Sequence, residues 1–405
     1  MPAVEDGQQL FVLRDLEELS DKPLALSAGG MLLISLLDGR RTAAQLAAEF
    51  HKNTGNEVDQ AVILELVNAL DAADYLETPA VADKRRKARD DFKLGKTRPA
   101  VFAGPSYPAE PAALTRALDG YLQAEGGPKK PTAKAAAAPP PLGLVAPHID
   151  FGRGGHAYGW AYQALSERKA PDVIVALGVA HVSPDSPWIF TPKPYETPFG
   201  AMEVDGALYD ALASKLWYDP RADEWVHKME HSLEFQATWL RWLYGDKTPR
   251  WVPILVSSFE RFSPDGAPSR IPTVSKALDD MAAALAEEAS NGRTVMVLNG
   301  IDLAHVGPRF GDELEPTPEL ASRIEGEDRA SLVSALAHDA DAFYASCVDG
   351  DGWRKVCGLS TLYTGLRLMK GLSGGKAGPG RLLAYGQAPD PAGGIVSFAS
   401  AVYDR

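Results

Sequence analysis

Residues 172–181 read DVIVALGVAH, an apolar, β-rich run that ends in a polar histidine. Three further runs have the same form, namely LGLVAPH at 142–148, WVPILVSS at 251–258 and RTVMVLNGIDLAH at 293–305. Segments with a helical pattern lie between these runs, at 154–168, 231–245 and 274–290. Strands that alternate with helices predict an α/β domain, in which a mixed central sheet carries helices on both faces.

Histidines occupy the ends of the predicted strands. His148, His181 and His305 each follow an apolar run, and His231 lies in MEHSLEF, where a helix is expected to begin. In sheets of this class, ligands bind beyond the carboxyl ends of the strands, and the architecture brings those ends to one edge. Imidazole is the commonest metal ligand in proteins and the usual general base near neutral pH. The pattern therefore predicts a metal or acid–base site at this edge.

Carboxylates and a cysteine accompany these histidines. Glu230, Asp302 and Asp150 stand beside three of the four histidines. Cys357, in KVCGLST, precedes a helical run, and a cysteine near a helix N-terminus has a lowered pKa. Cys357 is therefore either a thiolate ligand or nucleophile, or a small buried residue, and its spacing does not decide between these. Cys347 has no such setting and is expected to be structural.

Residues 1–80 form a distinct acidic module, with 14 Asp and Glu against 5 Lys and Arg. Apolar residues recur at helical spacing, Thr42 and Gln45 form a T-x-x-Q capping box, and FVLRDL and DYLETP are short enough to be strands. This order predicts a small winged-helix-like domain. The stretch resembles the PqqD-type winged-helix modules, which bind a peptide beside a radical enzyme. A docking or dimerisation module without peptide specificity is the alternative.

Two linkers and the overall charge complete the organisation. Residues 81–97 are expected to be a basic linker, and residues 98–405 the α/β domain. The Pro- and Ala-rich stretch 126–143 is expected to be an exposed loop. The net charge of −13 argues against nucleic acid as a partner. No apolar run is long enough to span a membrane and the N-terminus is acidic, so a cytoplasmic protein without a membrane partner is expected.

Several segments carry a family resemblance. RPAVFAGPSYPAEPAALTRALDGYL, VAPHIDFGRGGHAYGWAYQAL, ALGVAH, ETPFGAMEVD, EHSLEFQ, NGIDLAHVG and VCGLSTL occur in the order of the corresponding segments of the Memo family, also called AmmeMemoRadiSam system protein B. The closing AYGQ…GGIVSFASAVY resembles the closing strands of that family. The resemblance covers about 300 residues. It implies a fold similar to the class III extradiol dioxygenases, which are non-haem iron enzymes.

The resemblance also implies roles for individual residues. The metal ligands become His148, His181 and Cys357. The pocket residues that serve as acid–base or supporting groups become His305, Asp302, His231 and Glu230. This chain has Asp150 where the family has a glycine, so an extra carboxylate is expected to face the substrate pocket. Fe(II) is the favoured ion by this analogy, with Cu or Zn as alternatives because a thiolate ligand suits them.

Two functions remain open from the sequence. The first is a metal-dependent enzyme with dioxygenase-like chemistry that works with a radical SAM partner. The second is a non-catalytic protein that binds a peptide or partner on an enzyme-derived scaffold. The family name records association with a radical SAM protein and an AMMECR1-type protein, which are the partners the resemblance implies. The N-terminal module is expected to take a peptide ligand.

Overall fold

The structure is a computed structural model that describes residues 2–5, 8–13, 15, 17, 19–20, 22–129, 138–182, 184–262 and 267–405. The chain forms two compact units, Met1–Leu94 and Gly95–Arg405, and each is described by itself. Among the described residues, none of the helices combines the length and hydrophobicity that a membrane span requires.

The first unit contains a small antiparallel sheet and a set of helices. Its strands β1 (Pro2–Glu5), β2 (Gln8–Leu13) and β3 (Leu24–Leu26) pair in that order. Its helices are α1 (Ala28–Leu36), α2 (Ala43–Thr54), α3 (Gln60–Ala72) and α4 (Pro79–Leu94). The predicted capping box is confirmed, because the side chains of Thr42 and Gln45 each accept a backbone N–H of the other residue. Leu33, Leu46, Phe50 and Ile63 form the core of this unit.

Two segments of the first unit differ from their sequence-based interpretation. The prediction of a strand at residues 74–79 was wrong, because Asp74 adopts a positive φ of 59° in the turn after α3 and Pro79 begins α4. The predicted strand at FVLRDL is present as the end of β2, although Arg14 and Leu16 lie outside the described residues. Residues 81–97, expected as a basic linker, are largely helix α4, which buries Val81 and Phe92.

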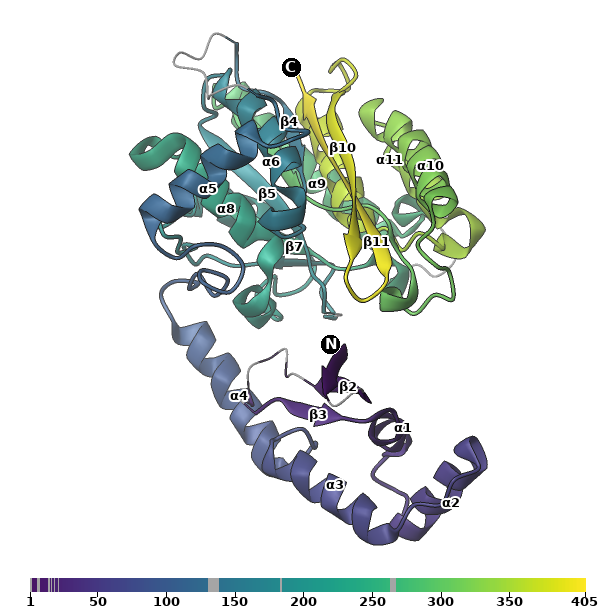
Figure 1. The fold of residues 1–405 in the computed structure, drawn as a ribbon. Helices are drawn as coiled ribbons and strands as arrows, with labels where there is room; N and C mark the ends of the chain where they lie inside the picture. Colours follow the sequence, from purple (N-terminus) through teal and green to yellow (C-terminus); the bar gives the residue numbers. More distant parts are fainter. Residues whose placement is uncertain are drawn as a thin grey trace. The chain divides into compact units, whose positions relative to one another are not determined.

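The second unit is built on a mixed sheet (Figure 1). Its strands are β4 (Gly143–Ala146), β5 (Val173–Val179), β6 (Trp188–Phe190), β7 (Arg250–Val256), β8 (Val295–Gly300), β9 (His305–Val306), β10 (Arg381–Asp390) and β11 (Gly394–Tyr403). The order is β10-β11-β4-β8-β5-β7-β6, and β9 pairs with β11. Strands β4, β8, β5 and β7 are parallel, whereas β6, β10 and β11 are joined antiparallel. The predicted mixed α/β sheet is therefore confirmed.

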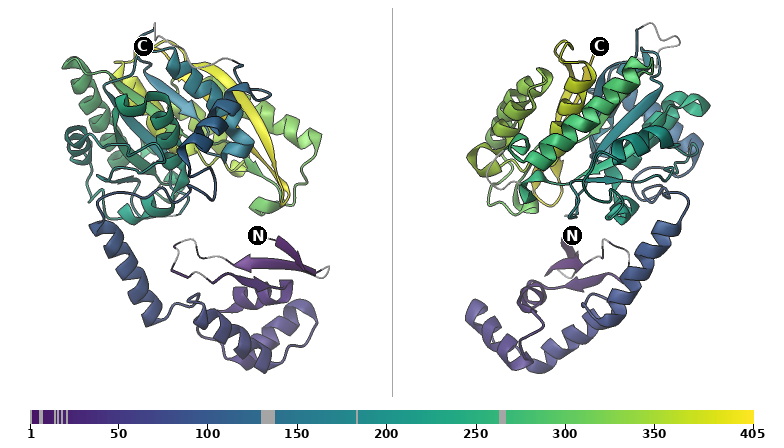
Figure 2. Two further views of the ribbon diagram at one scale, coloured as in Figure 1. Left: turned by 60° about the vertical axis from the view of Figure 1, so that its left-hand side comes forward. Right: turned by 180° about the vertical axis from the view of Figure 1, so that it is seen from behind.

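Helices cover both faces of this sheet (Figures 1 and 2). One face packs on α5 (Pro111–Gln123), α6 (Phe151–Ser166) and α8 (His231–Tyr244). The other packs on α7 (Gly206–Ala213), α9 (Pro272–Ser290), α10 (Pro318–Leu336), α11 (Ala340–Val348) and α12 (Leu359–Leu372). Short 3-10 turns join them: η1 (Glu224–Met229), η2 (Gly245–Lys247), η3 (Phe259–Arg261), η4 (Pro268–Arg270), η5 (Pro308–Phe310) and η6 (Asp349–Gly352).

Strand β5 shows why its sequence is apolar at every position. Val173, Val175 and Leu177 belong to the core on the α9 and α12 side, whereas Ile174 and Ala176 belong to the core on the α6 and α8 side. Successive side chains of a strand point to opposite faces, so a sheet covered on both faces needs apolar residues throughout. Because such a strand is held rigidly, the residues just beyond its end also have a fixed position.

The expected exposed loop at 126–143 is described only at its two ends. Its centre, residues 130–137, lies outside the described residues. The Gly126 carbonyl accepts a hydrogen bond from the Trp160 indole, and Leu142 is buried where the chain enters β4.

Candidate metal centre

Three neighbouring strands end at the same edge of the sheet. In the strand order, β8 lies between β4 and β5. His148, Asp302 and His181 each lie two residues beyond the last residue of β4, β8 and β5, respectively. His305 follows three residues after Asp302, in β9. The edge predicted from sequence therefore brings these four side chains into one region.

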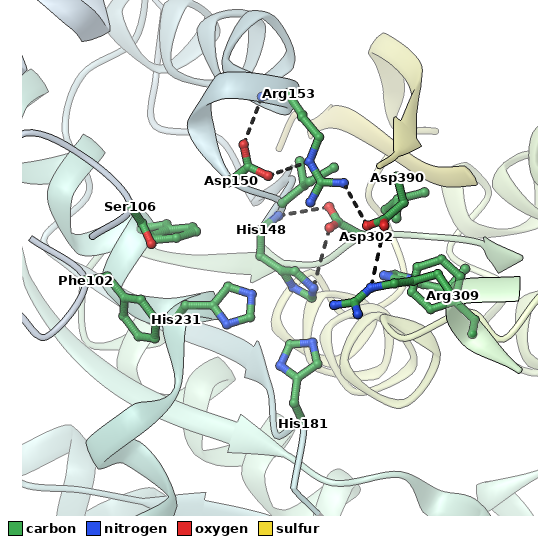
Figure 3. A pocket seen from close by; sticks show the side chains of 15 residues that line it. Phe102, Ser106, His148, Asp150, Arg153, His181, His231, Asp302, Arg309 and Asp390 are labelled. Carbon is green, nitrogen blue, oxygen red and sulfur yellow. Dashed lines mark hydrogen bonds and ion pairs between the residues drawn. The ribbon is translucent and has the colours of Figure 1, made fainter. Parts of the chain in front are cut away.

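A cluster of three histidines lies at this edge. One ligand nitrogen from each of His148, His181 and His231 lies within 4.8 Å of the other two. The ring centroids are 4.8–5.3 Å apart, and Figure 3 shows the three rings converging. His231 is the first residue of α8, so the start of that helix brings the third imidazole to the two strand ends. The sequence placed His231 among the acid–base groups, whereas here it also stands at ligand distance.

The hydrogen bonds of His148 and His181 leave one nitrogen of each ring available. The Nδ1 of His148 lies 3.0 Å from the Gly300 carbonyl, which can only accept, so this nitrogen carries the proton. The Nδ1 of His181 lies 3.0 Å from a carboxylate oxygen of Glu230. Metal-binding histidines typically donate their second ring N–H to a carbonyl or carboxylate in this way. Nε2 is therefore the nitrogen of each ring that can bind a metal ion once it has lost its proton.

Glu230 orients the histidines of this cluster. It is the N-cap residue of α8 and accepts the Ser232 backbone N–H at 2.9 Å. It also accepts the His181 backbone N–H at 3.0 Å and lies 3.3 Å from the His231 Nδ1. Burial alone would raise the pKa of this carboxyl, but His181 and its hydrogen bonds lower it far below the usual value. Glu230 is thus a buried carboxylate that orients two histidines.

Cys357 reaches the cluster from the opposite face of the sheet. Its Sγ lies 3.4 Å from the His148 Nε2. The next residue, Gly358, packs so closely on β8 that a Cβ there would lie 2.6 Å from the Asp302 carbonyl and from the Ile301 Cβ. Only glycine fits this contact, which brings the Cys357 thiol close to the end of β8. Burial would raise the pKa of the Cys357 thiol, but His148 and His305 lower it well below the usual value.

The donor set fits a transition-metal ion. Burial lowers the pKa of His148, but Asp302 and the Cys357 thiolate raise it to about 9, whereas burial lowers the pKa of His231 to about 3. In the chain alone, protons on His148 and His181 balance the thiolate charge. A divalent cation would replace those protons, because imidazole and thiolate are ligands for iron, copper and zinc.

Asp302 and His305 complete the strand-end group. Asp302 is buried and accepts the His148 backbone N–H at 3.0 Å, and its second oxygen lies 3.6 Å from the His148 Nε2. The Nδ1 of His305 lies 3.1 Å from the Leu303 carbonyl, so its Nε2 is the nitrogen left for chemistry. Asp302 therefore fixes the segment that carries His148, and His305 offers a further proton acceptor or donor.

A pocket of about 320 Å³ lies over the cluster (Figure 3). Its walls include the predicted residues His148, His181, His231, Asp302, His305 and Asp150. Glu230 and Cys357 are not among its lining residues. Cys357 instead lines a second cavity that shares His181 with the first. Glu230 was expected to act on a substrate, but it does not line the pocket and therefore acts through the histidines that it orients.

Asp150 lines the pocket, but its oxygens are already engaged. It is the N-cap residue of α6 and accepts the Arg153 backbone N–H at 3.1 Å. Its second oxygen accepts from the Arg153 guanidinium at 2.5 Å. The extra carboxylate noticed in the sequence therefore holds an arginine at the mouth of the pocket.

Sequence reasoning missed most of the remaining pocket wall. The additional lining residues are Phe102, Ser106, Ile149, Arg153, Phe235, Arg309, Phe310, Asp390 and Val396. Arg309 and Phe310 follow His305 within five residues, so proximity to a predicted site residue was a usable signal. Asp390 and Val396 come from the β10–β11 hairpin, which no spacing in the sequence connects to the histidines.

His227, just before this site, makes the second unit sensitive to acid. It is fully buried, its Nε2 donates to the Ile189 carbonyl, and its Nδ1 accepts from the Tyr195 hydroxyl. Burial lowers its pKa to about 3, compared with about 6.5 for an unfolded histidine. The unfolded chain therefore binds the additional proton below pH 6.5, so this contribution to stability is present above that pH and is lost as the pH falls toward 3.

We expect the His227→Gln variant to show a weaker loss of stability on acidification than the unmodified chain. Between pH 7 and pH 5 the histidine accounts for a loss of about 2 kcal/mol, at about 1.4 kcal/mol per pH unit below 6.5. Denaturant unfolding at both pH values measures this difference, and comparing the change within each protein cancels the packing cost of the substitution. An equal change in both proteins would contradict the assignment.

Comparisons with known proteins find a matching family model and several similar chains. A family model described as "Memo-like protein" matches residues 98–402. A MEMO1 family protein of Aquifex aeolicus is 27% identical over 396 residues, which are 97% of this chain and 96% of that protein. A MEMO1 family protein of Thermus thermophilus is 29% identical over 295 residues, covering 72% of this chain and 78% of the relative. An uncharacterized protein from Escherichia coli K12 with a solved structure aligns with a TM-score of 0.37 at 16% identity, covering 64% of this chain and 98% of that one.

Proposed function

The chain belongs to the Memo-like family over residues 98–402, and on that premise we propose that it is a metal-dependent enzyme with dioxygenase-like chemistry. The observation that carries the proposal is the set of three imidazoles whose ligand atoms lie within 4.8 Å of one another in the wall of a pocket. Fe(II) is the proposed ion, with Cu and Zn as alternatives. The similarity to class III extradiol dioxygenases that the Memo resemblance implies supports dioxygen as the co-substrate.

We propose His148, His181 and Cys357 as the ligands. The orientation of the two histidines, whose Nδ1 atoms already have acceptors, and the low pKa of the Cys357 thiol support this choice. His231 stands close enough to add a third nitrogen as a fourth ligand. When bound, iron would supply the one-electron redox chemistry that reaction with dioxygen requires.

The surrounding residues divide into proton carriers and supports. His231 and His305 line the pocket, so each can exchange a proton with a bound substrate. Burial lowers the pKa of His231 to about 3, so its imidazole is neutral near pH 7 and can accept a hydrogen bond from a substrate. Glu230 and Asp302 act through their hydrogen bonds to His181 and His148, so they are positioning residues.

The Cys357→Ser variant tests the proposed ligand set. A serine hydroxyl is a poorer ligand than a thiolate, so we expect the metal content of protein purified without air to fall from near one ion per chain to a small fraction. Elemental analysis measures the content, and the absorption or EPR signal of a sulfur-bound iron or copper ion should disappear with it. We expect a smaller loss of metal content in the His231→Ala variant.

Cys347 provides the matched control. It is buried in α11 and belongs neither to the histidine cluster nor to the lining of the pocket over it, and burial raises the pKa of its thiol to about 11. The Cys347→Ser variant should therefore keep both the metal and its spectrum. Metal-free protein that takes up none of Fe(II), Cu and Zn would refute the enzyme proposal. That outcome would favour the non-catalytic binding protein instead.

We further propose that residues 1–80 recruit the partners. The proposed partners are a radical SAM protein, an AMMECR1-type protein and a peptide ligand for the N-terminal module. This proposal rests on sequence resemblance. The relative from Aquifex aeolicus supports a shared role of the two units, because its similarity extends over 97% of this chain and thus into both units. The metal proposal does not depend on these partners.

A further inference from the structure

Arg309 extends into the pocket from a short turn beside the metal cluster. It lies in η5, four residues after His305, and its backbone N–H donates to the Gly393 carbonyl at 2.8 Å. This bond fastens the turn to the tip of the β10–β11 hairpin. Figure 3 shows the side chain entering the pocket with its guanidinium directed toward the histidines.

The guanidinium of Arg309 has little engagement with the protein. Its Nε lies 3.6 Å from an Asp390 oxygen, which is a loose ion pair. Among the described residues, no hydrogen bond involves its two terminal amino groups. Arg153, by contrast, is held by Asp150 at 2.5 Å and by Asp390 at 3.4 Å. Arg309 therefore presents the planar pair of N–H donors that fits a carboxylate or a phosphate.

The rest of the pocket selects between these anions. Asp150, Asp302 and Asp390 line the same space as Arg153 and Arg309, so the Asp and Arg side chains contribute three negative and two positive charges. Because Asp150 and Asp390 already hold Arg153, a second negative charge on the ligand would have no cation left to pair with. This disfavours a phosphate dianion and favours a monocarboxylate.

Phenylalanines provide the apolar surface of this pocket. Phe102 and Phe235 lie edge to face at 5.9 Å on the side of His231, and Phe310 packs against His305 at 5.1 Å. Aromatic rings bind well against such surfaces, edge to face or offset. The volume of about 320 Å³ is at the low end for ligand pockets, which limits the ligand to a small molecule.

We propose that Arg309 recognises the carboxylate of a small, single-ring aromatic acid, whose ring lies among Phe102, Phe235 and Phe310. The inference rests on the proposed function only in naming this acid as the substrate that is held beside the metal site. The recognition itself is made by the chain and does not need the metal.

Calorimetric titration of the full chain tests the proposal, with and without bound Fe(II). The probes are benzoate, phenylacetate, the uncharged benzamide and inorganic phosphate. We expect benzoate or phenylacetate to bind, and benzamide and phosphate to bind at least tenfold more weakly. Binding in the metal-free chain separates this inference from the proposed function, since a chain that takes up no metal could still bind the acid.

Three variants assign the binding to Arg309. Arg309→Met should weaken the binding of the acid by about tenfold to a hundredfold, the effect of losing hydrogen bonds to a charged group. Arg381→Met is the matched control, because Arg381 is exposed on β10 outside the pocket and its loss should change nothing. Asp390→Asn removes a competing carboxylate and should tighten binding several-fold, whereas a merely structural role of Asp390 would weaken it.

Three results would overturn the proposal. One is the absence of binding by both benzoate and phenylacetate to the unmodified chain. Another is equal affinity of the unmodified chain and the Arg309→Met variant for the acid. The third is Arg309-dependent binding of phosphate that is as tight as that of the acids, which would mark a general anion site.

Discussion

Replacing either His148 or His181 with alanine is expected to abolish stoichiometric metal binding. Each imidazole has its Nδ1 proton fixed by an acceptor, the Gly300 carbonyl or Glu230, and therefore holds its Nε2 in a set position where a metal ion can replace the second proton. Loss of one of two such ligands leaves too few donors in the correct geometry. Elemental analysis of protein purified without air or added metal gives the content, and we expect it to fall at least tenfold.

The control for this experiment is His51→Ala. His51 is an exposed histidine of helix α2 in the first unit, so its loss should leave the metal content unchanged. Circular dichroism checks that all variants retain their fold, which we expect because β4, β8 and β5 are paired through their backbones. Unchanged metal content in both the His148 and His181 variants would exclude this cluster as the metal site.

The sequence predicts the strand-end part of this site for a physical reason. The runs that end at His148, His181 and His305 are predominantly apolar without alternating, and strands covered on both faces require that pattern. Parallel strands share one carboxyl edge, so three such endings converge whatever their distance in sequence. The position of Asp302, two residues beyond β8, follows from the same argument.

The remaining features depend on contacts that no spacing encodes. His231 enters the cluster because Gly178 lets α8 approach β5, where a Cβ would lie 2.6 Å from the Ser232 hydroxyl. Asp390 reaches the pocket through a hairpin formed more than two hundred residues after His148. Residues 74–79 are short enough to form a strand, but the connection between α3 and α4 forms a turn instead. Tertiary packing overrides local pattern at such places.

A buried ion pair supports the loop before α8 and gives the second large expected effect. Arg98 and Glu234 are both fully buried and paired with each other. Arg98 also donates to the carbonyls of His227 and Glu230 at 2.8 Å each. Glu234 accepts from the Tyr107 hydroxyl and from the Phe102 backbone N–H. The pair thereby ties the segment that carries Phe102 to the start of the helix that carries His231.

We expect Arg98→Met to lower the free energy of unfolding of the second unit by about 3–5 kcal/mol, because it leaves a charged Glu234 buried without its partner. All eight tryptophans lie between Trp160 and Trp353, so tryptophan fluorescence during denaturant unfolding reports on this unit alone. Lys276→Met removes an exposed ion pair with Asp280 and should change stability by less than about 1 kcal/mol.

The double variant Arg98→Met, Glu234→Gln separates the cost of an unpaired charge from the cost of lost packing. If the buried charge dominates, the double variant will be more stable than Arg98→Met, because the neutral amide needs no cation. Additive losses would instead show that the hydrogen bonds of Arg98 to the His227 and Glu230 carbonyls are the main contribution. A loss no larger than that of Lys276→Met would refute the role of the pair. The His227 and Glu230 carbonyls precede His231 in the chain, so the Arg98→Met variant should also reduce the metal content. An ion pair that only stabilises the fold would leave the metal content of the folded protein unchanged.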